Sequence, residues 1–383
     1  MPQSVVIVGV GYTPFRSVSP EVSFREMIFE AAVKAYDDAG IKPSQVDTFV
    51  SVSEDYLEGT AIADEYVPDQ LGAVLKPVHT IGADGITALA SVFLQLRTGQ
   101  FSVAVVEGRS KASNILHPAH IEAMALDPVY ARPLGFHPRF VAGLEMRAFL
   151  EGTGNTEEQA ARVVEKNRRN ALRNPLAAYG AQVSVQDVLQ SAPLAEPLKE
   201  EEAARYADGA IVMVLATEAA ASQMKGQPVY IKGIGWAQDT PNLEERDWTR
   251  SVYAEQAARQ AYQMAGIGNP SHEIDFAEVD DTFGYKELQH LEALDLAPAG
   301  MAGQMLDEGV FSSGGRLPVN VSGGNLGCGC TYDLSGLRSV LEVVLQLRGH
   351  AGERQLKRAN VGLAQSWRGT PTASGGVVVL GRE

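Results

Sequence analysis

The chain has few cysteines, no long apolar run and a shortage of basic residues. Its two cysteines, Cys328 and Cys330, are separated by one residue, so we expect no disulfide framework and a reducing, cytoplasmic environment. No run approaches the roughly 20 apolar residues that span a bilayer, and we expect no membrane segment. The opening stretch MPQSVVIVGVG lacks the charged start and cleavage site of a signal peptide and predicts a strand.

Acidic residues outnumber basic ones. The chain contains 32 Lys and Arg against 47 Asp and Glu, for a net charge of −15. Nucleic acids are bound by clustered Lys and Arg, so this balance argues against a nucleic-acid partner, and an anionic ligand would need a local basic patch. The 45% hydrophobic content is ordinary for a globular protein, and 383 residues predict two domains or one two-lobed unit.

What the sequence does contain is an internal duplication. Four motifs occur twice. Each short match alone would be weak evidence of a duplication, but all four pairs occur in the same order. The pairs are IVGVG and IKGIG (from residues 7 and 231), AYDDAGI and AYQMAGI (35 and 261), KPSQVDTFV and NPSHEIDFA (42 and 269), and DGITALASVFLQLR and SGLRSVLEVVLQLR (84 and 335). A duplicated strand-helix-strand-helix unit predicts an α/β fold with two similar sheets, and the last pair predicts two long amphipathic helices.

The duplication divides the chain into an N-terminal half, 1–225, and a C-terminal half, 226–383. Residues from about 112 to 215 have no counterpart in the second half. We expect this segment, with EEQAARVVEKNRRNALRNP as a helix, to form a loop or cap insert over one lobe.

Four loops are expected to carry the function, because ligands in such folds bind beyond the carboxyl ends of the strands. They read TIGADGITALA from Thr80, EVDDTFGYKE from Glu278, VNVSGGNLGCGCTYDLSGL from Val319, and GLAQSWRGTPTASGG from Gly362. The third contains both cysteines, and its glycines predict an irregular, flexible loop rather than a helix or strand.

These loops, together with VVIVGVGYTPF, KNRRNALRNPLAAYG and GVVVLGRE, resemble the thiolase superfamily, in particular its sterol-carrier-protein-thiolase-like branch in bacteria and archaea. The resemblance covers essentially the whole chain. It implies a five-layer αβαβα fold, a dimeric core, coenzyme A thioester substrates and carbon–carbon bond chemistry by acyl transfer. The family's site uses two cysteines, a His in a Gly-His-Pro loop, and an Asn or His in the loop that here reads VDDTF.

Every one of those functional positions differs in this chain. Gly82 stands where the acyl-carrying Cys is expected, with Asp84 at the neighbouring Ser position. Asp280 replaces the Asn or His, and a carboxylate there would repel an oxyanion. Cys330 takes the place of the His, and Ser366 falls near the second Cys.

Two interpretations of Cys330 stay open. It could be a relocated nucleophile near a helix N-terminus, or a small buried residue that fills the space of the lost imidazole, which we favour. A metal site made by Cys328 and Cys330 lacks further ligands. Tyr332 could donate a phenolic hydrogen bond or serve only in packing.

The acidic residues allow two interpretations as well. Asp84, Asp280 and Asp281 could form an acid–base cluster in which like charges raise one pKa. Alternatively, Asp84 caps its helix and Asp281 is structural. Asp280 is the better functional candidate, because it replaces a position with a chemical role.

A basic run in the insert, Lys166, Arg168, Arg169 and Arg173, lies where the resemblance places the nucleotide end of coenzyme A. Such a cluster could receive phosphates, or it could be a solvated helix face. His117 and His137 lie in the same insert without a visible partner.

Two functions follow from this pattern. The first is an enzyme with a rebuilt site, for example for retro-aldol cleavage of a β-hydroxyacyl-CoA, which needs a base and enolate donors but no acyl-carrying Cys. The second is a non-catalytic subunit that pairs with an active thiolase or with a small zinc-ribbon and OB-fold partner. We expect a homodimer, no bound metal and no covalently bound cofactor, with the acyl-CoA as substrate.

Overall fold

The computed structural model describes residues 4–54 and 62–382, and its strands form a central sheet of nine. The strand order is β3 (Val78–Ile81), β2 (Thr48–Val52), β4 (Val103–Lys111), β7 (Asp208–Thr217), β1 (Val5–Tyr12), β8 (Val229–Gln238), β11 (Ser374–Gly381), β10 (Val361–Trp367) and β9 (Phe276–Glu278). We call the strands from β3 to β1 the first half-sheet and those from β8 to β9 the second. The half-sheets meet where β1 pairs with β8.

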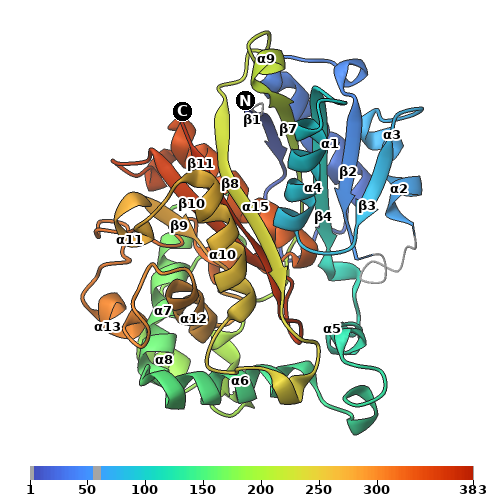
Figure 1. Ribbon diagram of the computed structural model, residues 1–383. Coiled ribbons are helices and arrows are strands. Elements are labelled where there is room, and N and C mark those ends of the chain that lie inside the picture. The colour runs from blue at the N-terminus through green and yellow to red at the C-terminus, as the bar shows by residue number, and fades with distance from the viewer. Residues whose placement is uncertain (1–3, 55–61, 383) are drawn as a thin grey trace.

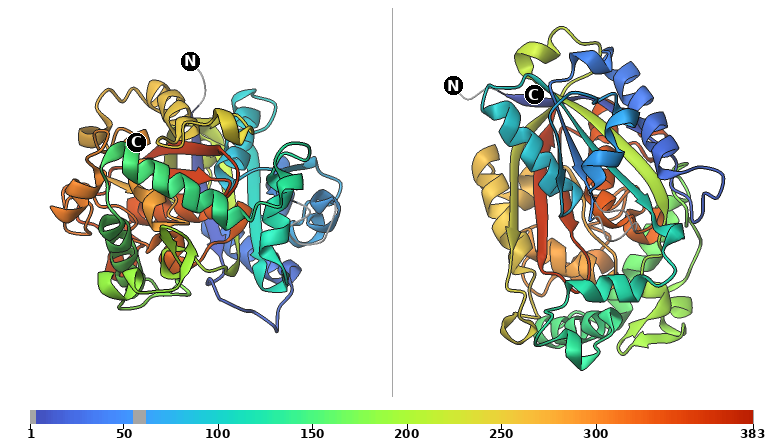
Figure 2. Two further views of the ribbon diagram at one scale, coloured as in Figure 1. Left: turned by 90° about the horizontal axis from the view of Figure 1, so that it is seen from below. Right: turned by 90° about the vertical axis from the view of Figure 1, so that its right-hand side faces the viewer.

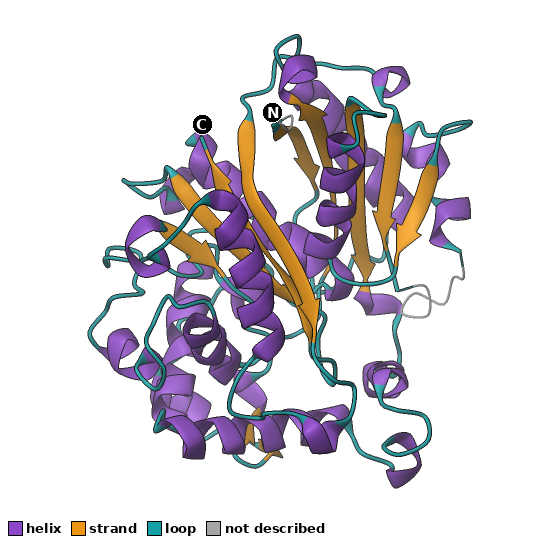
Figure 3. Ribbon diagram, in the orientation of Figure 1, coloured by secondary structure: helices purple, strands orange, loops and turns teal. Residues whose placement is uncertain are grey.

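Helices follow the same duplication. The first half contains α1 (Phe24–Ala39), α2 (Ala63–Tyr66), α3 (Pro68–Leu71), α4 (Gly85–Arg97) and α9 (Glu218–Ala221); the second contains α10 (Val252–Ala265), α11 (Pro270–Glu273), α12 (Gly284–Ala293), α13 (Ala302–Asp307), α14 (Gly324–Cys328) and α15 (Ser335–Arg348). Figure 3 shows these helices around the strands of the central sheet.

Helices and half-sheets alternate in five layers. α1 packs on β1 and β7 of the first half-sheet, and α10 packs on β8 and β11 of the second. Between the half-sheets lie α4 and α15, which contact each other, and α4 contacts strands of both halves. The order α1, first half-sheet, α4 with α15, second half-sheet, α10 confirms the predicted αβαβα fold.

Matching glycines show how closely the two halves repeat each other. A Cβ added at Gly9 of β1 would lie 2.4 Å from the carbonyl oxygen of Ala35 in α1. Its counterpart in β8, Gly233, would meet the carbonyl oxygen of Ala261 in α10 at 2.0 Å. The recurring glycine motifs are therefore places where a helix backbone lies directly on a strand.

The insert lies at the opposite end of the molecule from the two chain ends (Figures 1 and 2). It contains α5 (Pro118–Glu122), α6 (Pro138–Thr153), α7 (Glu157–Ala171), α8 (Val185–Leu189) and a small hairpin of β5 (Pro193–Ala195) and β6 (Leu198–Lys199). Helix α7 packs against α12, α13 and α14 of the second half. β7, whose residues 208–215 the sequence pattern assigned to the insert, pairs with β4 and β1 in the first half-sheet.

Two segments differ from the sequence-based expectation. The glycine-rich stretch is buried and contains the one-turn helix α14, because the Asp281 carboxylate accepts hydrogen bonds from the backbone N–H groups of Asn325 and Leu326. Helix α15 is amphipathic as predicted, but its polar side is not exposed, because all of its residues are buried between the half-sheets. Within the described residues, no helix has the length and apolar character needed to cross a membrane.

Candidate functional site

The four loops predicted to carry the function converge. The Ser366 hydroxyl on β10 donates a hydrogen bond of 2.5 Å to the carboxylate of Asp84. The backbone N–H of Asp280 donates to Gln365 Oε1 at 2.8 Å, and Asn325 Nδ2 donates to Asp280 Oδ2 at 2.7 Å. Contacts between residues far apart in sequence thus bring all four loops to one place, as expected for the carboxyl ends of strands in such a fold.

A pocket opens at this meeting point, between the loops and the insert. Its walls include Glu122, Tyr206, Asp280, Cys330, Tyr332 and Trp367. Three of the residues proposed from the sequence, Asp280, Cys330 and Tyr332, line it together. The other two, Asp84 and Ser366, are buried and are not among the lining residues.

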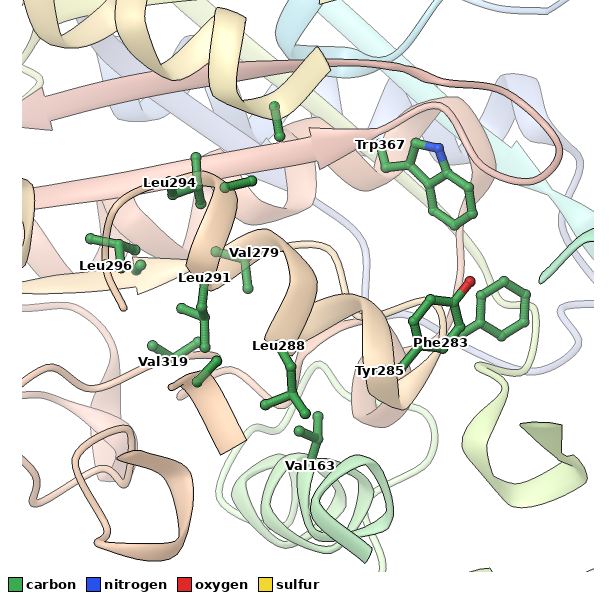
Figure 4. Packing of buried hydrophobic residues seen from close by; sticks show 14 of the residues in the cluster. Val163, Val279, Phe283, Tyr285, Leu288, Leu291, Leu294, Leu296, Val319 and Trp367 are labelled. Atoms are coloured by element: carbon green, nitrogen blue, oxygen red, sulfur yellow. The ribbon is translucent and has the colours of Figure 1, made fainter. Parts of the chain in front are cut away.

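Aromatic side chains support one wall of the pocket. Figure 4 shows Phe283 and Tyr285, which lead into α12, with Trp367 of β10 facing them. The Phe283 and Tyr285 rings stack with centroids 6.0 Å apart, and the Lys286 ammonium lies 4.3 Å from the centre of the Trp367 ring. These fully or nearly buried rings hold the pocket wall rigid.

Asp280 is held by a set of directed hydrogen bonds. Its Oδ1 accepts from the backbone N–H of Thr282 at 3.0 Å, while Asn325 occupies Oδ2. Its carbonyl accepts from His290 Nδ1 at 2.8 Å, so His290 Nε2 accepts in turn from the Tyr253 hydroxyl. Burial raises the pKa of Asp280, which brings its protonated form closer to neutral pH.

Both thiols are buried and protonated. Burial raises the pKa of Cys330 to about 12 and that of Cys328 to about 11. Cys328 Sγ donates to the Ser322 carbonyl at 3.3 Å. A thiol acts as a nucleophile through its thiolate, so neither cysteine is poised for acyl transfer, and the buried-residue interpretation of Cys330 is the one that the geometry supports.

Tyr332 adopts a left-handed backbone with φ of 50°, which is rare for an aromatic residue. Its ring stacks on that of Tyr206, with centroids 4.8 Å apart. Burial and the neighbouring Tyr206 raise the pKa of Tyr332, so its hydroxyl stays protonated at neutral pH. A protonated phenol in the pocket can donate a hydrogen bond to a ligand oxygen.

Asp84 caps helix α4, as the helix-cap interpretation predicts. Its carboxylate accepts from the backbone N–H groups of Ile86 and Thr87, at 2.8 and 3.3 Å. Together with the bond from Ser366, these contacts occupy the carboxylate and stabilise the helix N-terminus. Asp281, likewise, is occupied by α14 and by Asn167 Nδ2 at 2.7 Å, although burial raises its pKa to about 7.

The four predicted phosphate-binding residues do not form one surface. Lys166 is buried, paired with Glu287 at 3.0 Å and hydrogen-bonded to the Val319 carbonyl. Arg168 is buried and paired with Glu201 at 2.5 Å. Helix α7 is covered on two sides, by α12 and by the segment around Glu201. Lys166 and Arg168 therefore form their ion pairs in the interior of the protein.

Arg169 and Arg173 are exposed, but Arg173 is distant from the pocket. It lies in a groove with Leu345 and His350, at the C-terminal end of α15. Ser335, at the other end of the same helix, lines the pocket. Ten residues of helix separate Leu345 from Ser335, which is about 15 Å.

The insert supplies pocket residues that the sequence pattern did not reveal. Glu122, Arg139 and Tyr206 line the pocket beside Tyr332. His117 and His137, which did draw attention, are the N-cap residues of α5 and α6, the helices that contain Glu122 and Arg139. Among the residues that the structure describes, no three His, Cys, Asp or Glu side chains form a group that could hold a metal ion.

Comparison with known proteins finds relatives that cover almost the whole chain. A family model described as thiolase C-terminal domain-like matches residues 235–382. The chain is 31% identical to an acetyl-CoA acetyltransferase of Methanothermobacter thermautotrophicus over 376 residues, covering 96% of this chain and 97% of that protein. It is 29% identical to sterol carrier protein 2 of Bos taurus over 401 residues, covering 98% and 71% of the two proteins.

The solved structure of the Ltp2-ChsH2(DUF35) aldolase is similar to this one, with a TM-score of 0.85. The match covers 99% of this chain and 98% of that chain at 24% sequence identity. At this identity the likeness establishes the shared fold alone.

Proposed function

This chain belongs to the thiolase superfamily, in its sterol-carrier-protein-thiolase-like branch, and we propose that it cleaves or forms a carbon–carbon bond in a coenzyme A thioester by aldol chemistry. The substrate class would be a β-hydroxyacyl-CoA, and the products a shorter acyl-CoA and an aldehyde or ketone. The relative in Methanothermobacter thermautotrophicus is named an acetyl-CoA acetyltransferase, and the structural relative is named an aldolase.

One observation carries the proposal: the pocket has acid–base groups but no thiolate. Asp280 and Tyr332 line it, while the lining thiol, Cys330, has a pKa of about 12. Gly82 takes the position of the acyl-carrying Cys. Acyl transfer through a thioester intermediate needs a nucleophile that this pocket lacks, whereas retro-aldol cleavage needs only proton transfer and stabilisation of an enolate.

The proposed role of Asp280 and Tyr332 is to stabilise that enolate. A carboxyl group with a raised pKa can remain protonated and donate a hydrogen bond to the thioester oxygen, as in known enolising enzymes. The Tyr332 hydroxyl would be the second donor. Two donors aimed at the same developing negative charge form an oxyanion site.

The test compares two reactions on the purified chain. Release of aldehyde from a 3-hydroxyacyl-CoA is measured beside thiolysis of acetoacetyl-CoA by free coenzyme A. We expect aldehyde release, and at least about a 100-fold loss of kcat in Asp280→Ala, which removes the proposed donor. Asp37→Ala, at an exposed aspartate on α1, serves as the matched control and should leave kcat unchanged.

Efficient thiolysis without aldehyde release would overturn the proposal, because it would require an acyl-carrying nucleophile. Equal activity of Asp280→Ala and the parent chain would remove Asp280 from the mechanism.

A second candidate, a subunit that docks on a partner protein, is favoured by an apolar surface. The insert exposes Leu116 just before α5, and Val129, Tyr130 and Leu134 between α5 and α6, each with more than 60% of its surface accessible. Exposed apolar patches of this kind mark protein interaction sites. The structural relative is a two-component aldolase, Ltp2-ChsH2(DUF35), so we propose a small zinc-ribbon and OB-fold protein as the partner.

Co-purification with such a partner, lost on Tyr130→Glu, would support this candidate. A parent chain that turns over thioesters without any partner would contradict the purely non-catalytic form.

The expected homodimer also remains a proposal. β3 lies at the edge of the sheet, paired on one side with β2, so a second copy could pair with its free edge.

A further inference from the structure

Three side chains of the insert and its junction form a closed group at the pocket. The Tyr206 hydroxyl donates to Glu122 Oε1 and accepts from Arg139 Nη2 at 2.8 Å. Arg139 Nη2 also lies 3.8 Å from Glu122 Oε1. Tyr206 is fixed to the rest of the site, because its backbone segment pairs with Cys330, and Cys330 N–H donates to the Arg205 carbonyl at 2.8 Å.

One oxygen of this group has no hydrogen-bond partner within the part of the chain that the structure describes. It is Glu122 Oε2, which is buried, as is the side chain as a whole, of which only 9% is accessible. Among the same described residues, the buried Tyr332 hydroxyl on the neighbouring ring also makes no hydrogen bond. A buried oxygen of either kind normally has a hydrogen-bond partner, so these two pocket atoms point to groups that a ligand provides.

From this geometry we propose that Glu122 binds the β-hydroxyl of the substrate and is the base that removes its proton. The assignment rests on the proposed function. Tyr206 and Arg139 occupy Oε1 and fix the carboxylate, which leaves Oε2 as the acceptor. Tyr206 and Arg139 are therefore positioning residues, and Glu122 is the catalytic one.

The step balances within the pocket. Glu122 takes the hydroxyl proton, the O–H electron pair forms the new C=O bond, and the Cα–Cβ bond breaks with its electrons moving into the thioester enolate. The same proton returns from Glu122 to Cα, which yields the shortened acyl-CoA and regenerates the carboxylate. No oxidant, reductant or metal is needed.

The surroundings shift the pKa of the Glu122 carboxyl upward. Burial raises the pKa of Glu122, while Arg139, the hydrogen bond from Tyr206, and His137 at the start of α6 oppose that rise. Two further rings pack on the group: that of Tyr332 on Tyr206, and that of Phe283 on the Arg139 guanidinium. A base whose pKa lies nearer the working pH accepts and returns a proton with similar ease.

The experiment uses Glu122→Gln, which keeps an acceptor for Tyr206 but removes the base. With 3-hydroxybutyryl-CoA we expect kcat to fall at least about 100-fold, KM to rise because the contact with the hydroxyl is weakened, and the acidic limb of the kcat profile to disappear. Tyr206→Phe should lower kcat less and move that limb. Glu151→Gln, an exposed glutamate on α6, is the matched control.

A binding measurement separates this proposal from the proposed function. By calorimetry the parent chain should bind 3-hydroxybutyryl-CoA more tightly than butyryl-CoA, and Glu122→Gln should lose that preference. Loss of the preference supports Glu122 as the hydroxyl acceptor even if no aldehyde is ever released. In that outcome the proposed aldol reaction is contradicted, while the binding role of Glu122 stands. Unchanged preference and unchanged kcat in Glu122→Gln overturn the assignment, whatever Asp280→Ala does.

Discussion

The Ser366 hydroxyl lies 2.5 Å from the Asp84 carboxylate, across 282 residues of sequence. The bond joins β10 of the second half to the N-terminus of α4 in the first half, at the bottom of the site. Because both side chains are buried, the bond forms part of the interface between the halves rather than a surface contact.

Replacing Asp84 should therefore weaken the fold. Asp84→Ala removes the cap of α4 and leaves the Ser366 hydroxyl without its acceptor, so we expect unfolding to become easier by about 2 kcal/mol. Urea denaturation followed by circular dichroism measures the change. Thr156→Ala, which removes the cap of α7 outside the interface, should cost less; an Asp84→Ala chain as stable as the parent would contradict the cap assignment.

The duplicated glycines give a second prediction. Gly9→Ala and Gly233→Ala each place a methyl group against a helix carbonyl, at 2.4 and 2.0 Å, so each should destabilise the chain by about 2 kcal/mol or more. Gly314→Ala is the matched control, because it is exposed and has no atom within 4 Å of the added Cβ. Thermal denaturation compares the three. A tolerated Gly233→Ala would show that α10 can move away from β8.

These glycines also illustrate why so much of the fold could be predicted from sequence. Strand, helix and cap signals are local, and the duplication doubles each of them, so the α/β fold and the convergence of four loops followed from the pattern. The pocket residues of the insert could not be found this way. Tyr206 and Glu122 are 84 residues apart, and nothing near either one indicates their contact.

The basic run shows the opposite failure, in which a local pattern was clear but misleading. Lys166 and Arg168 have the charge expected of a phosphate site, yet α7 is packed on two sides and both cations pair with buried or half-buried glutamates. Charge alone does not reveal whether a helix face meets water or another helix.

The thiols provide a third prediction. Cys328 and Cys330 should react with iodoacetamide at pH 8 at least about 100-fold more slowly in the folded chain than in urea, because both are buried and their pKa values are raised to about 11 and 12. Mass spectrometry of the two peptides measures the labelling. Rapid alkylation of Cys330 in the folded chain would restore it as a candidate nucleophile.

Stability should also depend on pH through Glu202. Burial raises the pKa of this carboxyl from 4.5 to about 7, and its Oε2 accepts from the Lys199 N–H at 2.8 Å. Its contribution is thus fully present below pH 4.5 and is lost as the pH rises through 7. The Gln side chain of Glu202→Gln has no proton to lose. As the pH rises from 4.5 to 7, the free energy of unfolding of this variant should therefore increase relative to that of the parent, by at most about 3 kcal/mol.

Urea denaturation of both chains at pH 5 and pH 8.5 measures this difference. Glu200→Gln, in the same turn, is the control. A gap between Glu202→Gln and the parent that is the same at both pH values would mean that the carboxyl ionises normally in the fold.

The proposed dimer can be tested at the edge of the sheet. The carbonyls of Pro77 and Ile81, on the β3 side, accept hydrogen bonds from N–H groups of the β2 segment. The alternation along a parallel ladder therefore turns the N–H of Thr80 away from β2, toward the outer edge of the sheet. Thr80→Pro removes that donor without touching the pairing with β2, so light scattering should report a dimer for the parent chain and a monomer for the variant. The control is Thr80→Val, which keeps the N–H and should remain dimeric. A Thr80→Pro chain that is folded by circular dichroism and still dimeric would show that the two copies meet elsewhere.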